Sequence, residues 1–385
     1  MSFKKYYQHF LKAHGDVLHM ACHSHHFWPD VTRQATLDYW DDSAKHSDQK
    51  WGIIFGEKIP KLQSHIAKTL KIDKAENIVF APNTHDLLIR LLSTLPTKRK
   101  PRILTTDGEF HSFSRQINKL VEEDLIEITK VSSFPSNSFW SSFEDALNEK
   151  NFDMIFISQI FYNSGTSIDD LERIVKLADK HGKIIIDGYH SYFTRPLDLS
   201  KIQNKIYFMS GHYKYAQGGE GLCFMTCPDD GANPVITGWF AEFEALSSKT
   251  GEVTYPTHAG RYLGSTMDFT PLYRSLSVYD LFEKEGITLD VIRSHILKLQ
   301  KKFLEIIKEV NHTEINEKSL IQDESQERGQ FLAFKLESTQ ACQDLEQGLR
   351  SIGILTDSRA NILRFGFSLY QDELDFERLR RIKDL

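Results

Sequence analysis

The sequence has little cysteine, no long apolar run and no strong excess of charge of either sign. Its four cysteines are spread over 385 residues without the spacing of a disulfide framework, which favours reduced thiols. No stretch approaches the roughly 20 apolar residues that span a bilayer, and the opening MSFKKYYQHFLKAHGD lacks the apolar core of a secretory signal. The formal net charge of -6, without a basic run, disfavours nucleic acid as a partner. We therefore expect a cytoplasmic protein that binds neither membrane nor nucleic acid.

Apolar, β-rich segments recur through the first two thirds of the sequence and alternate with stretches of helical periodicity. The β-rich segments are 77–83, 102–110, 153–161, 183–190, 205–212 and 221–227, and the helical stretches between them include 87–95, 113–124 and 170–182. This alternation predicts an α/β fold with a mostly parallel sheet covered by helices on both faces. In such sheets ligands bind beyond the carboxyl ends of the strands.

The pattern changes after about residue 275. A long helical pattern over 281–310 is followed by short strand-like segments at 331–337 and 361–370. The length also favours more than one structural unit, at about 150 residues per domain. We expect a large domain over 51–275 and a smaller α+β domain over 276–385.

Three predicted strand ends carry side chains that suit one kind of chemistry. A lysine, Lys214 in MSGHYKYAQGGEG, can form a covalent imine with a carbonyl. The carboxylate of Asp187, one strand earlier, can hold a pyridine nitrogen protonated. The turn Asn83-Thr84-His85-Asp86 opens onto a helix whose N–H groups can bind a phosphate. A lysine, a carboxylate and a phosphate-binding turn are together the groups that bind pyridoxal 5′-phosphate.

Each of these side chains has a plainer interpretation. A strand-end lysine is commonly solvated, and an aspartate after a β-branched run is commonly a turn or capping residue. A nucleotide-binding P-loop is excluded by residue order, because its glycines precede the lysine. Here Gly218, Gly219 and Gly221 follow Lys214, so they predict a turn back into the next strand.

Six short motifs occur in one order between about residues 75 and 375. They are EFHS (109–112), DGYH (187–190), YKY (213–215), GWF (238–240), ERGQF (327–331) and DSRANILRFGFSLY (357–370). Together they resemble the class V branch of the pyridoxal-phosphate enzymes of fold type I, and within it kynureninase. The resemblance implies the fold-type I transferase fold, pyridoxal 5′-phosphate as cofactor, and a homodimer with shared active sites. It also implies that residues 1–50 pack near the active site and the small domain.

The resemblance assigns roles to individual residues. Lys214 would bind the cofactor covalently and move protons, while Asp187 would pair with the ring nitrogen. Phe110 would stack on the ring. The other residues expected to bind the cofactor of their own subunit are Thr84, His85, His190, His212 and Tyr213. Ser265 and Thr266 are expected to reach the cofactor of the neighbouring subunit, and Trp239 to lie at that subunit boundary.

The resemblance also implies that Arg364 binds the carboxylate of the substrate, a role that suits a planar guanidinium because it matches two carboxylate oxygens. The alternation in NILRFGF places Arg364 on one strand face with Ile362 and Gly366, where a buried cation is costly unless it finds an anion. A structural ion pair with Asp357 or Asp372 is the alternative.

The segment CHSHHFWPD (22–30) departs from the family pattern, of which it retains only Ser24. His23, His25 and His26 suggest a metal site, but they lack the spacing that aims ligands at one point. We expect His23 and Ser24 to line the substrate pocket and no metal to be bound.

The expected function is that of a pyridoxal-phosphate enzyme acting on an α-amino acid, with kynureninase-like hydrolytic cleavage of a C–C bond in the side chain as the first choice. An aminotransferase is an alternative, because the same residues can return a proton to the cofactor. A cysteine desulfurase or selenocysteine lyase is another, although the segment 353–364 before Arg364 lacks the cysteine that a persulfide mechanism needs. A non-catalytic binding protein on the same fold is the alternative outside enzymes.

Overall fold

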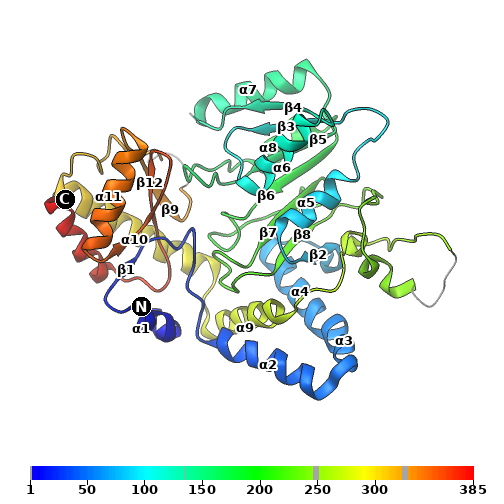
Figure 1. Cartoon of the computed structure of the whole chain (residues 1–385), viewed down its shortest axis with the longest axis horizontal. Coiled ribbons are helices and arrows are strands. Elements are labelled where there is room, and N and C mark those ends of the chain that lie inside the picture. The colour runs from blue at the N-terminus through cyan, green and yellow to red at the C-terminus, as the bar shows by residue number, and fades with distance from the viewer. Residues whose placement is uncertain (1, 135, 246–250, 323–327) are drawn as a thin grey trace.

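A seven-stranded sheet forms the centre of the larger lobe of the protein (Figure 1). The computed structural model describes residues 2–134, 136–245, 251–322 and 328–385. In their order across the sheet, the strands are β2 (Ile78–Ala81), β8 (Cys223–Thr226), β7 (Ile206–Gly211), β6 (Lys183–Asp187), β5 (Met154–Ser158), β3 (Arg102–Thr106) and β4 (Glu127–Val131). Only β8 runs antiparallel to its neighbours. The expected mostly parallel α/β sheet is therefore confirmed.

Six of the seven strands lie where the apolar segments predict them, whereas β4 was missed. The two faces of the sheet explain both results. In β5, Met154 and Phe156 face one hydrophobic core while Ile155 and Ile157 face the other. A strand buried on both faces is a continuous apolar run. The edge strand β4 is fully buried only at Val131, so its sequence shows no such run.

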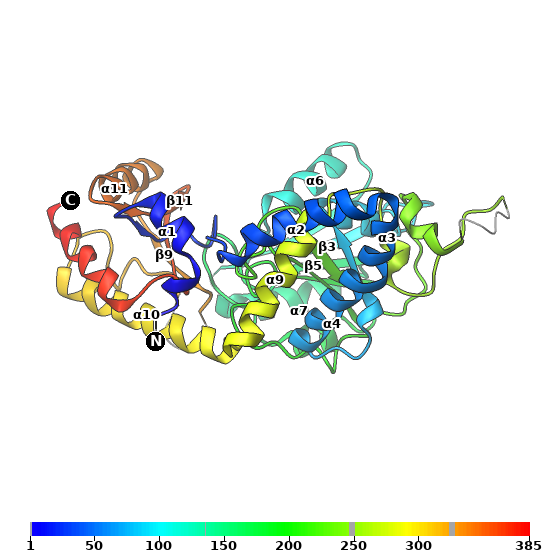
Figure 2. The same ribbon diagram turned by 90° about the horizontal axis from the view of Figure 1, so that it is seen from below.

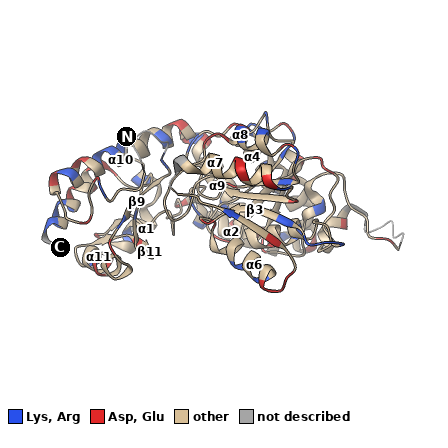
Figure 3. Cartoon of the chain, turned by 90° about the horizontal axis from the view of Figure 1, so that it is seen from above, with Lys and Arg blue, Asp and Glu red and all other residues tan. Residues whose placement is uncertain are grey.

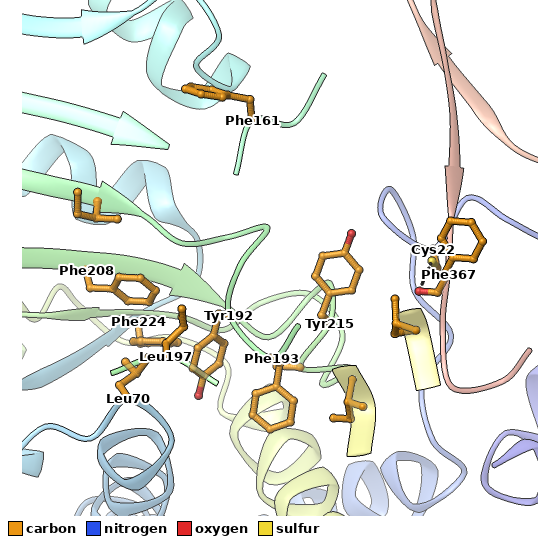
Figure 4. Packing of buried hydrophobic residues seen from close by; sticks show 14 of the residues in the cluster. Cys22, Leu70, Phe161, Tyr192, Phe193, Leu197, Phe208, Tyr215, Phe224 and Phe367 are labelled. Atoms are coloured by element: carbon orange, nitrogen blue, oxygen red, sulfur yellow. Dashed lines mark hydrogen bonds between the residues drawn. The ribbon is translucent and has the colours of Figure 1, made fainter. Parts of the chain in front are cut away.

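Helices cover both faces of the sheet. The face shared by Ile155 and Ile157 is covered by α4 (Ile59–Leu70), α7 (Ser136–Glu149), α8 (Leu171–Ala178) and α9 (Thr270–Glu285), and the opposite face by α5 (Thr84–Leu92) and α6 (His111–Glu122). Beside α9 lies α2 (Val31–His46), which continues into the short α3 (Lys50–Ile53) (Figure 2). Aromatic residues from the loops after β6 and from β7 and β8 fill the space above α4 (Figure 4).

The smaller lobe contains a three-stranded antiparallel sheet and a long helix. Its elements are α10 (Leu289–Val310), β9 (Phe331–Lys335), α11 (Thr339–Ser351), β10 (Ile354–Leu355), β11 (Asp357–Arg359), β12 (Ile362–Gly366) and the 3-10 helix over 373–384. Acidic and basic residues are interspersed along α10 (Figure 3). The helical pattern over 281–310 is two helices, because α9 ends at Gly286 in the left-handed conformation and Thr288 caps α10. The predicted boundary between residues 275 and 276 falls within α9.

The N-terminal segment joins the two lobes (Figure 1). After α1 (Gln8–His14), the strand β1 (Leu18–His19) pairs with β10 of the smaller lobe. The backbone then crosses to the larger lobe, where α2 packs along α9. Within the described ranges, no helix has the length and apolar character that a membrane span requires.

Replacement of Phe224 tests the core beneath the sheet. Phe224 is fully buried and its ring centroid lies 4.8 Å from that of Tyr192. We expect Phe224→Ala to lower the free energy of unfolding by about 3–5 kcal/mol, since the surrounding rings cannot fill the cavity. Phe134→Ala, at a side chain that is 48% exposed, is the matched control and should change it by less than about 0.5 kcal/mol. Equal effects of the two substitutions in denaturant titrations would contradict this packing.

Candidate active site

A pocket of about 290 Å³ lies where the parallel strands of the large sheet end. The strands β2, β3, β5, β6 and β7 run in one direction, so their carboxyl ends share one edge of the sheet. We call this the cofactor pocket. Its walls include Thr84, Phe110, Ser158, Tyr162, Asp187, Tyr189, His190, Tyr213, Lys214, Glu220 and Cys223.

Lys214 follows β7 and presents its amine to the cofactor pocket. The residue is only 9% exposed, and its Nζ contacts Nε2 of His190. The ring centroids of Phe110 and Tyr189 each lie 5.5 Å from Nζ. Burial, together with the charge of Arg364, lowers the pKa of Lys214 to about 7. Much of the amine is thus unprotonated at neutral pH, which is the form that attacks a carbonyl.

Asp187 ends β6, next to the strand that leads to Lys214. Burial raises the pKa of its carboxyl group to about 6, and the backbone N–H of Tyr189 donates to its Oδ1 (2.9 Å). Burial and the charge of Lys214 hold the pKa of His190 well below its usual range, so its imidazole is neutral. Nδ1 of His190 has no hydrogen-bond partner among the described residues. A carboxylate and an imidazole therefore face the amine from the adjacent strand end.

The helix α5 begins at the rim of the pocket. Asn83 caps it by accepting from the backbone N–H of Asp86 (2.9 Å), and Thr84 lines the pocket. The first backbone N–H groups of α5 consequently point to the place where the sequence predicts a phosphate. His85 is exposed and lines a neighbouring surface depression instead.

A buried carboxyl group that the sequence reasoning missed supports the pocket wall. Glu109 accepts from the hydroxyl groups of Thr106 (2.7 Å) and Ser158 (2.5 Å), and burial raises its pKa to about 8. It directly precedes Phe110, whose ring lines the pocket and is 39% exposed. The position of Glu109 in the EFHS motif, directly before Phe110, is the sequence feature that could have indicated its place at the pocket.

The histidine-rich segment lies against the lysine loop and the smaller lobe. His25 Nδ1 hydrogen-bonds with the hydroxyl of Tyr213 (3.0 Å), and His26 Nε2 with that of Ser368 (2.8 Å). His23 is fully buried and stacks on Phe331. Neither His23 nor Ser24 is among the residues that line the cofactor pocket. In the described part of the protein, no three His, Cys, Asp or Glu side chains are grouped to hold a metal ion.

Arg364 forms the ion pair that the sequence left as an alternative. Its Nε and Nη2 donate to Asp357 Oδ1 (3.0 Å) and Oδ2 (2.5 Å), and Nη1 donates to the carbonyl oxygen of Tyr162. Nε2 of His23 also lies 2.6 Å from Asp357 Oδ1. Although burial alone would raise it, the neighbouring His23 and Arg364 hold the pKa of Asp357 well below its usual range. Asp372 lies elsewhere and pairs with Lys4 (3.6 Å).

Besides His85, four predicted cofactor-binding residues lie away from the cofactor pocket. His212 is fully buried among aromatic rings behind it, with Tyr192 and Phe224 as neighbours. Trp239 is exposed and packs on Phe240. Ser265 and Thr266 are exposed and line a separate cavity beside α5. Glu327 of the ERGQF motif lies outside the described residues.

The residues of the cofactor pocket fit pyridoxal 5′-phosphate. Lys214 would bind the cofactor carbonyl, Asp187 the ring nitrogen and the start of α5 the phosphate. The unpartnered Nδ1 of His190 is a buried polar atom that a bound group can satisfy. The rings of Phe110 and Tyr189 lie near the amine, and Lys214 is itself only 9% exposed.

Removal of the Lys214 amine tests this fit. We expect Lys214→Ala protein to lack the yellow absorption band that wild-type protein shows after addition of pyridoxal phosphate. Lys201→Ala, at a side chain that is 74% exposed, should keep the band. The rate at which wild-type apoprotein develops the band should rise as the pH rises through about 7, because the fraction of unprotonated Lys214 rises there. A rate that stays constant across that range would contradict the lowered pKa.

Comparisons with known proteins identify the family and the fold. A family model described as aminotransferase class-V matches residues 29–379. Among solved structures, the chain is similar to the cystine C–S lyase C-DES in complex with its reaction product cysteine persulfide (17% identity, 97% of this chain, 99% of that chain, TM-score 0.82). It is also similar to the cysteine desulfurase CsdA from Escherichia coli (13%, 99%, 96%, 0.79) and to a cysteine desulfurase from Thermococcus onnurineus NA1 (15%, 95%, 93%, 0.76).

A comparison with curated protein sequences gave no significant match. The match of the family model over most of the sequence shows the family, and the solved structures show the fold. The chain belongs to the class-V aminotransferase family and is a pyridoxal-phosphate-dependent enzyme of fold type I.

Proposed function

We propose that this enzyme is a lyase that cleaves a bond in the side chain of an α-amino acid without using a thiol of its own. The observation that carries the proposal is the position of the Lys214 amine, which lines the pocket, contacts His190 and has a pKa lowered to about 7. An amine with this pKa can accept and return a proton at neutral pH. Among the described residues that line the pocket, no second amine is present.

Each of the residues around the amine of Lys214 has a separate role in the proposed reaction. Bound pyridoxal phosphate supplies an electron sink that stabilises negative charge at the α-carbon of the substrate. Lys214 removes the α-proton and holds it at Nζ, where the neutral His190 orients the amine. Asp187 would keep a proton on the ring nitrogen, and Phe110, which lines the pocket, would pack against the ring. Cleavage would break the bond between the β-carbon and its substituent; the bonding electrons would leave with the substituent, which can take the proton held on Lys214.

A persulfide relay on the enzyme is disfavoured by the positions of the thiols. Cys223 is the one cysteine that lines the cofactor pocket within the described residues. Burial raises the pKa of its thiol to about 12, and its Sγ lies 3.6 Å from the hydroxyl of Tyr189. A thiol that remains protonated is a poor nucleophile. Cys22 and Cys342 are buried in the smaller lobe or beside it.

C–S bond cleavage is the reaction that we favour. The similarity to C-DES, described as a cystine C–S lyase, extends over almost the whole of both proteins. Kynureninase-like hydrolytic C–C cleavage is the second candidate, supported by the DGYH and YKY motifs and by a pocket walled by Phe110, Tyr162 and Tyr189, whose rings suit an aromatic side chain.

A homodimer with shared active sites forms part of the proposal. Trp239, Ser265 and Thr266 are exposed in one subunit and do not reach its own cofactor pocket. Ser265 and Thr266 lie near α5, since the cavity that they line also contains Asp86 and Arg90. A second copy could bring these residues to the rim of the first pocket.

A substrate panel tests the reaction. Holoenzyme should release sulfide or persulfide from cystine or cysteine, while kynurenine should release no anthranilate and 3-hydroxykynurenine no 3-hydroxyanthranilate. Selenocysteine is included to test for release of selenium, and amino acids paired with 2-oxo acids are included to test for transamination. Anthranilate formation without sulfur release would instead establish the second candidate, and transamination alone would contradict cleavage within the substrate's side chain.

Cys223→Ser tests the absence of an enzyme thiol from the reaction. We expect this variant to keep most of the turnover of wild type, because the buried thiol of Cys223 takes no part in bond cleavage. Cys342→Ser, on α11 in the smaller lobe, is the matched control. Loss of turnover in Cys223→Ser alone, with the cofactor band unchanged, would assign a persulfide role to Cys223.

A further inference from the structure

A buried carboxyl group without a cation contacts the wall of the cofactor pocket. Glu109 is 4% exposed, and none of its side-chain contacts among the described residues is with a lysine, arginine or histidine. An unpaired carboxylate is costly to bury, so such a group takes up a proton instead. Burial raises the pKa of Glu109 to about 8, although hydrogen bonds from Ser158 and Thr106 oppose the shift; the charge of Asp187 on β6 adds to it. Glu109 therefore carries a proton at neutral pH.

The hydrogen bonds around Glu109 indicate where this proton lies. The Thr106 hydroxyl accepts from the backbone N–H of Gly108 (3.1 Å) and donates its own proton to Oε1 of Glu109 (2.7 Å). The other carboxyl oxygen, Oε2, lies 2.5 Å from Oγ of Ser158, which is within the range of an O–H···O hydrogen bond. When Glu109 is ionised, Ser158 donates across this distance. When Glu109 is protonated, Oε2 donates to Oγ and the bond reverses its direction.

Ser158 connects this bond with the cofactor pocket. It is the last residue of β5, lines the pocket and pairs with Asp187 in the register of β5 and β6. Paired residues of neighbouring strands present their side chains on the same face of a sheet. Among the described residues, the Ser158 hydroxyl has no hydrogen-bond partner besides Glu109. Once that bond is reversed, the proton of the Ser158 hydroxyl is free to be donated into the pocket.

We propose that Ser158 donates a hydrogen bond to the bound cofactor, and that protonated Glu109 turns the Ser158 hydroxyl toward it. Glu109 is thus a positioning residue, which acts through Ser158 and does not itself contact the cofactor. When Glu109 loses its proton, the Ser158 hydroxyl turns back to the carboxylate and the pocket loses a donor. The inference rests on pyridoxal 5′-phosphate as the cofactor and is independent of the bond that the enzyme cleaves.

Titration of apoprotein with pyridoxal phosphate at pH 7 tests both residues. We expect Ser158→Ala to raise the dissociation constant roughly threefold to tenfold, the effect of one neutral hydrogen bond. Glu109→Gln should bind like wild type, since its amide N–H donates to Ser158 Oγ and its carbonyl oxygen accepts from Thr106. Ser351→Ala, at an exposed position at the end of α11, is the matched control and should also bind like wild type.

The pH dependence distinguishes positioning by Glu109 from a purely structural role. The dissociation constant of wild type, divided by that of Glu109→Gln, should rise from about one at pH 7 to roughly two to six at pH 9, because only wild type can lose the proton. Asp187 and Lys214 titrate lower, with pKa values of about 6 and 7, and are present in both proteins. His190, whose pKa lies well below its usual range, stays neutral in both.

Unchanged binding by Ser158→Ala would overturn the proposal, as would a ratio that stays constant between pH 7 and pH 9. Binding by Glu109→Gln at pH 7 that is as weak as that of Ser158→Ala would also overturn it. In the Ser158→Ala background, Glu109→Gln should have no effect at either pH; an effect that persists there would show that Glu109 does not act through Ser158. If no amino acid were cleaved, the proposed function would be rejected and these binding results would still stand.

Discussion

Removing the amine of Lys214 from water disfavours its charged form, and the site depends on this effect. The neighbouring residues maintain it: rings of Phe110 and Tyr189 flank the amine, and the neutral imidazole of His190 contacts it. Asp187 opposes the shift through its negative charge, but burial and Arg364 outweigh it. The result is an amine that changes protonation near neutral pH, which suits both covalent binding of a carbonyl and proton transfer.

The position of that amine is set by contacts from both lobes. The parallel strands bring Asp187 and Lys214 to one edge of the sheet. The histidine-rich N-terminal segment then connects the lysine loop, through His25 and Tyr213, with the smaller lobe, through His26 and Ser368. Its histidines serve as hydrogen-bonding and packing residues, which gives a structural reason for a segment whose composition alone suggested metal binding.

Charge pairing in the smaller lobe depends on the register of the hairpin that lies at the pocket edge. The sequence predicts that Arg364 lies on a half-buried strand and offers two possible ion-pair partners, Asp357 and Asp372. The hairpin of β11 and β12 brings Asp357 directly opposite it, while Asp372 is drawn to Lys4. The same hairpin leaves Arg359 half-exposed at the edge. Which arginine carries uncompensated charge thus follows from strand register.

By itself, the sequence determined the mostly parallel sheet and its cofactor. Strands buried on both faces are continuous apolar runs, and their polar ends mark Thr84, Asp187 and Lys214. Only the tertiary structure decided the rest. The edge strand β4 lacks an apolar run, the break at Gly286 is hidden in one helical pattern, and His212 follows a strand end yet is turned into the core. The pairing of Arg364 and the burial of Glu109 depend on residues distant in the sequence, because side-chain partners are chosen by packing and register, which periodicity cannot specify.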